Sequence, residues 1–136
     1  MIRSSVLFLA AILFLSSCSK NSLSGKKQLK LLPEAELQNM ATSQYQQFLS
    51  STKVVGTTNN RDAEMVKRVG QRIVKAVEAY YAEIGKTGDL TGYKWEVNLV
   101  EDKTVNAWCM FGGKIVVYTG ILPITQNEAA LAAVMG

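Results

Sequence analysis

The sequence contains no histidine among its 136 residues, and this absence excludes several kinds of active site. Without an imidazole, a cysteine or serine nucleophile has no histidine base, and the commonest metal ligand in proteins is missing. The carboxylates and thiols that remain are scattered along the chain and match no tetrahedral ligand spacing. We therefore expect neither a catalytic residue nor a metal ligand within this stretch of sequence.

Long apolar runs are also absent. The longest stretch, from Val6 to Leu15, is much shorter than the roughly 20 apolar residues that a membrane-spanning helix needs. Because Arg3 precedes this stretch and two serines follow it, residues 1–17 are predicted to be a secretory signal peptide.

Cysteine is limited to Cys18 and Cys109. The run Leu15-Ser16-Ser17-Cys18 resembles a bacterial lipobox, in which the cysteine is acylated and becomes the new amino terminus. This resemblance implies a lipid anchor on Cys18. Because Ser19 follows, it also implies a location at the periplasmic face of the outer membrane of a Gram-negative bacterium. An ordinary signal peptide with a chance cysteine is the alternative.

Cys109 allows two interpretations. As a nucleophile it would lack a histidine base, and if Cys18 carries lipid it also lacks a disulfide partner. In an alternating strand it would share one face with Val105 and Ala107, which favours a thiol buried in the core. We expect this buried thiol.

Neither sign of charge dominates the chain. The 15 basic and 11 acidic residues give a net charge of +4 with no dense basic face, which argues against nucleic acid as a partner. The segment 18–32 is rich in serine and lysine, and it is predicted to be a flexible spacer between the lipid anchor and the domain. Its lysines could add weak attraction to a membrane surface: Lys20, Lys26, Lys27 and Lys30.

Two helices are expected at the start of the remaining domain, residues 33–136. Pro33 at a first-turn position, with acidic residues after it, predicts a helix to about Ser50. A second helix is bracketed by Asn60 and Gly85. Its apolar residues recur at spacings of three and four and are expected to pack on a sheet, although a partner-binding face is the alternative: Val66, Val69, Ile73, Val77, Tyr80 and Ile84.

Three strands and a last helix follow. Apolar and polar residues alternate over 93–99, as in a half-buried strand. Two β-prone runs, 105–110 and 115–119, flank the pair Gly112 and Gly113 and predict a hairpin. The order helix, helix, strand, strand, strand, helix predicts an α+β fold, with the helices packed on a small antiparallel or mixed sheet.

The last helix is predicted to begin at Thr125, because Glu128 follows three residues later as in a capping box. Strong helix formers then continue to Gly136, and neither a capping signal nor a proline closes the helix. We expect the helix to continue beyond this residue, so that the chain would be an amino-terminal fragment.

These segments together carry a longer pattern: Asn-Ala-Trp at 106–108, Gly-Gly-Lys at 112–114, an apolar strand, and Asn-Glu-Ala-Ala-Leu-Ala-Ala-Val-Met-Gly at 127–136. The pattern resembles the HtpX-type zinc metallopeptidases, which are gluzincins with an HExxH motif directly after this helix opening. The resemblance implies the amino-terminal part of a zincin-like metallopeptidase domain, with the first histidine after Gly136. One departure is Phe111, where relatives usually have a proline that would fix φ.

The same resemblance implies that Asn106, Ala107 and Trp108 belong to an edge strand, to which a peptide substrate adds as an extra strand. Asn106 would hold the substrate backbone, Ala107 would offer its carbonyl, and Trp108 would shape a side-chain pocket. The alternative is a turn role for Asn106 and a core role for Trp108. Zinc would be bound by the histidines of a full-length relative and by no residue of this chain.

The function implied by this resemblance is a zinc-dependent metalloendopeptidase that cleaves extended or unfolded periplasmic polypeptides, with this chain inactive on its own. A non-catalytic peptide-binding lipoprotein that keeps the edge strand is the alternative, and a structural lipoprotein is a third possibility. The codons after Gly136 would separate these functions, because the enzyme requires His-Glu-x-x-His there.

Overall fold

The computed structural model describes residues 18–20, 27–29 and 32–136. The predicted signal peptide, residues 1–17, lies outside these ranges. Within them, no helix is both long and apolar enough to cross a membrane. The chain divides into two compact units, residues 1–34 and 35–136.

The first unit contains a short antiparallel pair of strands. β1, Cys18–Lys20, pairs with β2, Lys27–Leu29, so that Ser19 lies opposite Gln28. This pair lies within the segment that was predicted to be a flexible spacer, which therefore contains regular backbone pairing. Acylation of Cys18 stays a prediction.

The second unit is built on a four-stranded mixed sheet with the strand order β3-β4-β6-β5. The strands are β3, Val54–Val55, β4, Glu96–Val100, β5, Ala107–Met110, and β6, Lys114–Tyr118. β4 and β6 run parallel, whereas β3 and β5 are antiparallel to their neighbours. Along the chain, the edge strand β5 therefore comes before β6, which lies in the centre of the sheet. The predicted α+β fold is confirmed, and the sheet is of the mixed kind.

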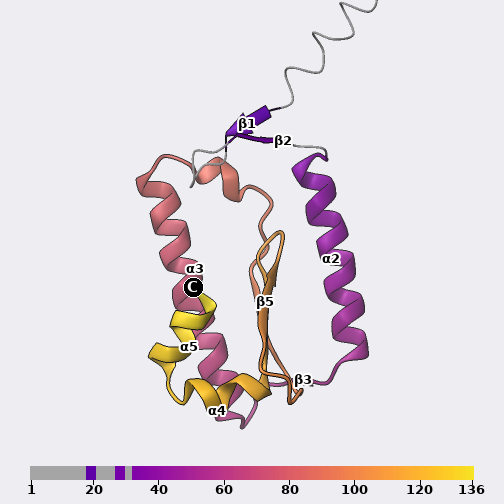
Figure 1. Cartoon of the computed structure of the whole chain (residues 1–136), viewed down its shortest axis with the longest axis vertical. Coiled ribbons are helices and arrows are strands. Elements are labelled where there is room, and N and C mark those ends of the chain that lie inside the picture. The colour runs from indigo at the N-terminus through magenta and orange to yellow at the C-terminus, as the bar shows by residue number, and fades with distance from the viewer. Residues whose placement is uncertain (1–17, 21–26, 30–31) are drawn as a thin grey trace, which may run out of the picture. The chain divides into compact units, whose positions relative to one another are not determined.

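Helices cover both faces of this sheet (Figure 1). α2, Glu34–Ser51, lies on one face, while α3, Arg61–Glu83, and α5, Glu128–Met135, lie on the other. Short helical turns complete the unit: η2, Thr87–Leu90, η3, Thr119–Ile121, and α4, Leu122–Thr125. The central strands are therefore buried on both faces, which explains the continuous apolar run in β6.

Two core clusters result from the alternation of side chains along the strands. On the side of α3 and α5, the cluster contains Ala63, Val66, Val69, Leu99, Val117, Ile121 and Leu131. On the side of α2, a smaller cluster contains Tyr45, Val100 and Val116, with aromatic side chains packed around it. Neighbouring residues such as Val116 and Val117 therefore serve opposite faces.

α3 begins as predicted, but its apolar stripe is buried only in part. Asn60 is the N-cap, and its Oδ1 accepts a hydrogen bond from the backbone N–H of Ala63 at 2.9 Å. The prediction that the whole stripe packs on the sheet is wrong at its end, where Tyr80 and Ile84 are exposed. A helix of 23 residues is about 35 Å long and a strand of 5 residues about 17 Å, so the helix extends beyond the sheet.

The last helix begins later than predicted. Thr125 is buried at the end of α4, and Gln126 has a φ of 61°, which separates α4 from α5. Asn127 is the N-cap of α5, because its Oδ1 accepts a hydrogen bond from the backbone N–H of Ala130 at 2.9 Å. The prediction at Thr125 is wrong because Pro123 starts a separate helical turn that already includes Thr125.

Candidate functional site

The strand that carries the predicted site residues lies at an edge of the sheet. Among the described strands, β5 pairs with β6 alone. Just before β5, the C=O of Asn106 accepts a hydrogen bond from the backbone N–H of Tyr118 at 3.1 Å. Residues that bond to the neighbouring strand alternate with residues that do not in an antiparallel ladder. The peptide groups of Ala107 and Cys109 therefore point away from β6, toward the open edge.

The three predicted site residues are not on one side of the sheet. The side chain of Asn106 is exposed at the start of β5, and Ala107 packs against the core cluster on the side of α3 and α5. Trp108 packs against the opposite cluster, beside α2. Because successive side chains of a strand point to opposite faces, the indole lies away from the face that α5 covers.

Trp108 belongs to an aromatic cluster between β5 and α2. Its ring centroid lies 5.0 Å from that of Phe48 and 6.4 Å from that of Tyr45, both in edge-to-face orientations. Its Nε1–H donates a hydrogen bond to the hydroxyl of Tyr118 at 3.2 Å. The rings of Phe48 and Tyr118 stack at 6.3 Å. The indole is therefore held by apolar contacts and by one polar contact.

The prediction that Cys109 is a buried core thiol is wrong. Cys109 is exposed, as is Val105, because β5 is an edge strand and of this face only Ala107 is covered by the core. Its Sγ–H donates to the C=O of Met110 at 3.4 Å. Partial desolvation by neighbouring atoms raises the pKa of the thiol, which lowers the thiolate fraction at neutral pH. These properties do not suit a nucleophile.

The loop that leads into β5 is fixed by the turn after β6. The hydroxyl of Thr119 donates to the C=O of Asp102 at 2.9 Å and accepts from its N–H at 3.1 Å. The N–H of Gly120 donates to the same carbonyl at 2.8 Å, and a Cβ at this glycine would overlap the loop backbone. The backbone N–H of Thr104 donates to the carboxylate of Asp102 and lowers its pKa. These bonds set the position from which Asn106 starts the edge strand.

The turn between β5 and β6 has the predicted glycines. Gly112 and Gly113 have φ values of 77° and 81°, in the region that glycine occupies without strain. Phe111 stands where the relatives usually have proline, and its ring lies 6.2 Å from that of Tyr93. The turn therefore forms without the proline.

Lys114, the first residue of β6, is a buried charge whose role the sequence analysis missed. It is 1% exposed, and its Nζ donates to the carboxylate of Glu96 and to the C=O of Lys94, each at 2.5 Å. The Nζ also lies 5.8 Å from the ring centroid of Tyr45. A lysine at the start of an otherwise apolar, central strand is the signal that could have indicated this pair. The pair of Lys114 with Glu96 connects β6 with β4, and the contact of Lys114 with Tyr45 connects β6 with α2.

α5 is joined to α3 by apolar and charged contacts. Leu131 is fully buried in the core cluster. The carboxylate of Glu128 accepts two bonds from the guanidinium of Arg68 and lies 3.8 Å from that of Arg72. Arg68 holds the pKa of Glu128 below its usual value. Ala132 helps to line a groove of about 400 Å³ between the two helices.

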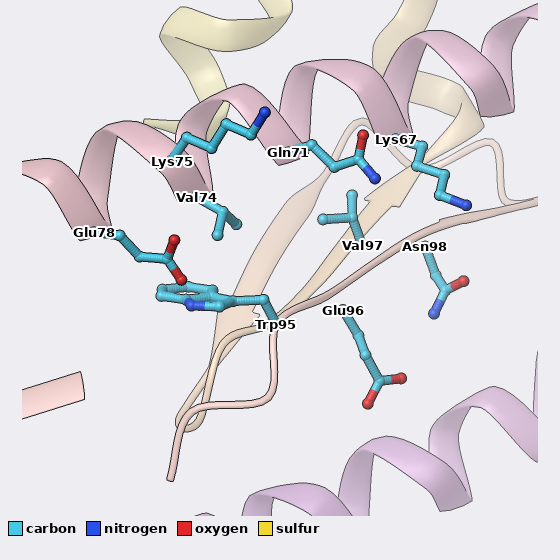
Figure 2. A pocket seen from close by; sticks show the side chains of 9 residues that line it. All are labelled: Lys67, Gln71, Val74, Lys75, Glu78, Trp95, Glu96, Val97 and Asn98. Atoms are coloured by element: carbon cyan, nitrogen blue, oxygen red, sulfur yellow. The ribbon is translucent and has the colours of Figure 1, made fainter. Parts of the chain in front are cut away.

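A larger groove lies between α3 and β4, and one strand, β6, separates β4 from the edge strand β5. Its volume is about 580 Å³, and Figure 2 shows Trp95 and Val97 of β4 and its approach below the side chains of α3. The lining residues are Lys67, Gln71, Val74, Lys75, Glu78, Trp95, Glu96, Val97 and Asn98. Lys67, Lys75 and Glu78 of α3 carry the charges of this groove, whereas the Glu96 carboxylate points away from α3 and accepts a bond from Lys114. This mixture of charges indicates no single class of ligand.

The residues that the structure describes do not fit a zinc ion. They contain no group of three or more histidine, cysteine, aspartate or glutamate side chains that could hold a metal. A protein zinc site needs three or four such ligands close together. No zinc-dependent step can therefore be derived from these residues, and the expectation that the chain alone binds no zinc stays a prediction.

The second unit has a mixed sheet with an open edge strand, a long helix, α3, packed on one face, and a short helix, α5, after the last strand. These elements define part of a zincin-like α+β domain. The model of peptidase family M48 matches residues 60–136, more than half of the chain, and the chain belongs to this family. The family resemblance inferred from the sequence is confirmed.

The chain is also similar to parts of several curated proteins. The chain is 46% identical over 50 residues to the mitochondrial metalloendopeptidase OMA1 of Arabidopsis thaliana, which covers 37% of the chain and 10% of that protein. The Saccharomyces cerevisiae protein of this name is 38% identical over 65 residues, covering 46% of the chain and 19% of that protein. The Danio rerio protein is 20% identical over 133 residues, covering 96% and 26%. The chain thus spans between 10% and 26% of these relatives.

The predicted location at the periplasmic face of a bacterial outer membrane is wrong by this comparison. The relatives are all named as mitochondrial enzymes, including the one from Schizosaccharomyces pombe. Targeting signals are short sequence patterns that carry no fold information, so a brief apolar stretch before Cys18 is weak evidence for one compartment.

Proposed function

We propose that this chain supplies the substrate-binding side of a zinc-dependent metalloendopeptidase that cleaves extended or unfolded polypeptides. One observation carries the proposal. The peptide groups of Ala107 and Cys109 point toward an open sheet edge, next to the exposed side chain of Asn106. Membership of peptidase family M48 and the names of the relatives support the peptidase activity.

Addition of a strand explains the class of substrate. A peptide that pairs with β5 would bond to the N–H and C=O groups of Ala107 and Cys109, and these groups recognise any backbone. The peptide must be extended over several residues, because a helix or a folded loop cannot offer its backbone to a sheet edge. Unfolded or flexible segments are therefore the expected substrates. The side chain of Asn106 would add a bond to the peptide backbone beyond the end of the strand.

The chain itself is expected to bind such peptides without cleaving them. It has no histidine, and its described residues offer no zinc ligand set. Elemental analysis of the purified chain should find no stoichiometric zinc, and incubation with unfolded casein should give no fragments. About one tightly held zinc per chain, or proteolysis that a chelator abolishes, would contradict this part of the proposal.

The activity is tested in a form of the protein that continues through an HExxH motif. This form should cleave unfolded casein and spare a stable folded protein, and removal of zinc by a chelator should abolish the cleavage. Equal cleavage of the folded protein would contradict recognition by strand addition.

A non-catalytic peptide-binding protein is the second candidate function. It is favoured by the same edge strand, which requires no metal to bind a peptide. The codons that follow Gly136 separate the two functions, because the enzyme requires His-Glu-x-x-His and the binding protein requires a stop codon.

Acylation of Cys18, with membrane attachment through the lipid, is a separate proposal. It rests on the resemblance of residues 15–18 to a lipobox. Metabolic labelling with a fatty-acid analogue should mark the chain but not the variant Cys18→Ala, and equal labelling of the two would refute it.

A further inference from the structure

We propose that α2 positions the edge strand β5 for peptide binding through the aromatic cluster of Phe48, Trp108 and Tyr118, here called the aromatic clamp. The inference rests on the proposed function, since it assigns positioning residues to the same peptide-binding edge. None of the three rings would touch the peptide. They act on it through the backbone of β5.

β5 needs such support because it is short and paired on one side. It has four residues, and β6 is its single partner among the described strands. A strand held by one ladder twists and frays more easily than a central strand. Its two bonding peptide groups, at Ala107 and Cys109, are useful to a peptide only when they lie in the plane of the sheet.

Trp108 is the residue through which that plane can be fixed. It lies between Ala107 and Cys109, and its side chain points to the face opposite the core contact of Ala107. A rotation of the indole about the strand axis would tilt the peptide groups on both sides of it. Holding the ring still therefore holds the open edge in its bonding orientation.

The clamp holds this ring from two directions. Phe48 of α2 packs edge-to-face against the indole, with ring centroids 5.0 Å apart. The hydroxyl of Tyr118 on β6 accepts the bond from Nε1–H at 3.2 Å, and the Tyr118 ring stacks on Phe48 at 6.3 Å. Each of the three rings thus contacts the other two, and α2 completes a set that the sheet alone would leave open.

α2 also has contacts that do not involve the clamp, so the role of Phe48 can be tested with α2 still in place. The amide Nδ2 of Asn98 donates to the hydroxyl of Tyr45 at 2.7 Å, and Tyr45 is buried. Gln38 donates from Nε2 to the C=O of Thr91 at 2.9 Å. Loss of the Phe48 ring therefore removes a contact of Trp108 without removing the attachment of the helix.

The test compares four variants of the whole chain in a Trp95→Phe background, in which Trp108 is the one tryptophan. Phe48→Ala removes a clamp ring, Phe48→Tyr keeps it, and Tyr118→Phe removes the hydroxyl that accepts the indole bond. Val66→Ala is the matched control, since it truncates a buried side chain in the cluster on the other side of the sheet. Affinity for a short peptide of alternating valine and threonine is measured by Trp108 fluorescence, at a temperature where circular dichroism shows each variant folded.

The expected result is a loss specific to the clamp. Phe48→Ala should weaken peptide binding by about 10-fold, Tyr118→Phe by about 3-fold, and Phe48→Tyr and Val66→Ala by less than about 2-fold. Equal affinity of Phe48→Ala and Val66→Ala would overturn the proposal. If Phe48→Ala does not fold, Tyr118→Phe decides the question against the same control, and an unchanged affinity overturns it.

A second readout separates this proposal from the proposed function. Hydrogen exchange of the Trp108 and Met110 amides, which bond to β6, needs no peptide. It should be at least about 10-fold faster in Phe48→Ala than in Val66→Ala, relative to the amides of β4 in the same chain. If the unmutated chain binds no peptide, the proposed function fails while this exchange still tests the clamp, and equal exchange in the two variants refutes it.

Discussion

The three predicted site residues, Asn106, Ala107 and Trp108, differ in where their side chains lie. Ala107 packs on the side of α3 and α5, the indole of Trp108 lies beside α2, and the side chain of Asn106 is exposed just before the strand. The sequence motif could place all three on one strand, but it could not say which face a second helix covers. Long-range packing of Phe48 on the indole, 60 residues apart in sequence, decided that.

Replacement of Asn106 by alanine tests the residue that would hold the substrate backbone. In a form of the protein that contains the HExxH motif, Asn106→Ala should lower kcat/KM by roughly 10- to 1,000-fold, because one bond near the reacting centre is lost. Zinc content and Tm should stay unchanged, since the side chain is exposed and its backbone C=O keeps the bond from Tyr118. Val105→Ala, at the neighbouring exposed position, is the control. A fall in Tm with unchanged kcat/KM would assign Asn106 a turn role instead.

Cys109 should react slowly with alkylating reagents although it is exposed. Its pKa is raised above the ordinary value of 9.0, so the reactive thiolate is scarce at neutral pH. In a Cys18→Ser variant, the rate of reaction with iodoacetamide should rise with pH and reach half its maximum above pH 9.0. A rate at pH 7 that exceeds that of free cysteine would contradict the raised pKa.

At the scale of elements, periodicity predicted most of the fold, and boundaries failed where two local signals competed. The spacing of Val66 and Val69, the N-cap Asn60 and the glycine pair of the turn all led to the observed structures. Thr125 failed because a short turn built on Pro123 used the same residues. The parallel pairing of β4 with β6 could not be predicted, since it depends on which strand the returning chain meets.

The cap of α5 gives a prediction about that boundary. Asn127→Ala should lower the free energy of unfolding by about 1 kcal/mol, because the N–H of Ala130 loses its acceptor. Thr125→Val should cost less, since the C=O of Leu122 to which the Thr125 hydroxyl donates also accepts the N–H of Gln126. Urea denaturation of both variants measures the difference. A larger loss for Thr125→Val would restore Thr125 as the cap.

The contact of α5 with α3 should depend on pH. The folded-state pKa of Glu128 is lowered below its ordinary value of 4.5 by Arg68, so its contribution is present above pH 4.5 and is lost as pH falls through the lowered value. Glu128→Gln should therefore be less stable than the unmutated chain at pH 7 and nearly as stable at pH 3. Other carboxylates titrate equally in both proteins and cancel in the comparison. The same difference at both pH values would show that the pair with Arg68 contributes nothing.

The proposed peptidase needs a peptide-binding strand and a set of zinc ligands, and the described part of the chain has the first of these. The described sheet has an open edge strand supported on both faces, and the described residues contain no metal-ligand cluster. The expectation that this chain alone binds no zinc rests on composition, because a chain without histidine cannot build the usual zinc site. The match to peptidase family M48 explains why such a strand is present. A peptide-binding edge is the part of the proposed activity that this chain can be tested for directly.

Amide hydrogen exchange of the isotopically labelled chain, with and without the valine–threonine peptide, tests this account most directly. Strand addition at β5 predicts that the amides of Ala107 and Cys109 exchange fast in the free chain and slowly once the peptide binds, because they gain partners in the new ladder. The amides of Trp108 and Met110, already bonded to β6, should change little. Protection of Trp95 and Val97 beside the groove of α3, with no change at Ala107 and Cys109, would contradict the assignment of β5 as the peptide-binding edge.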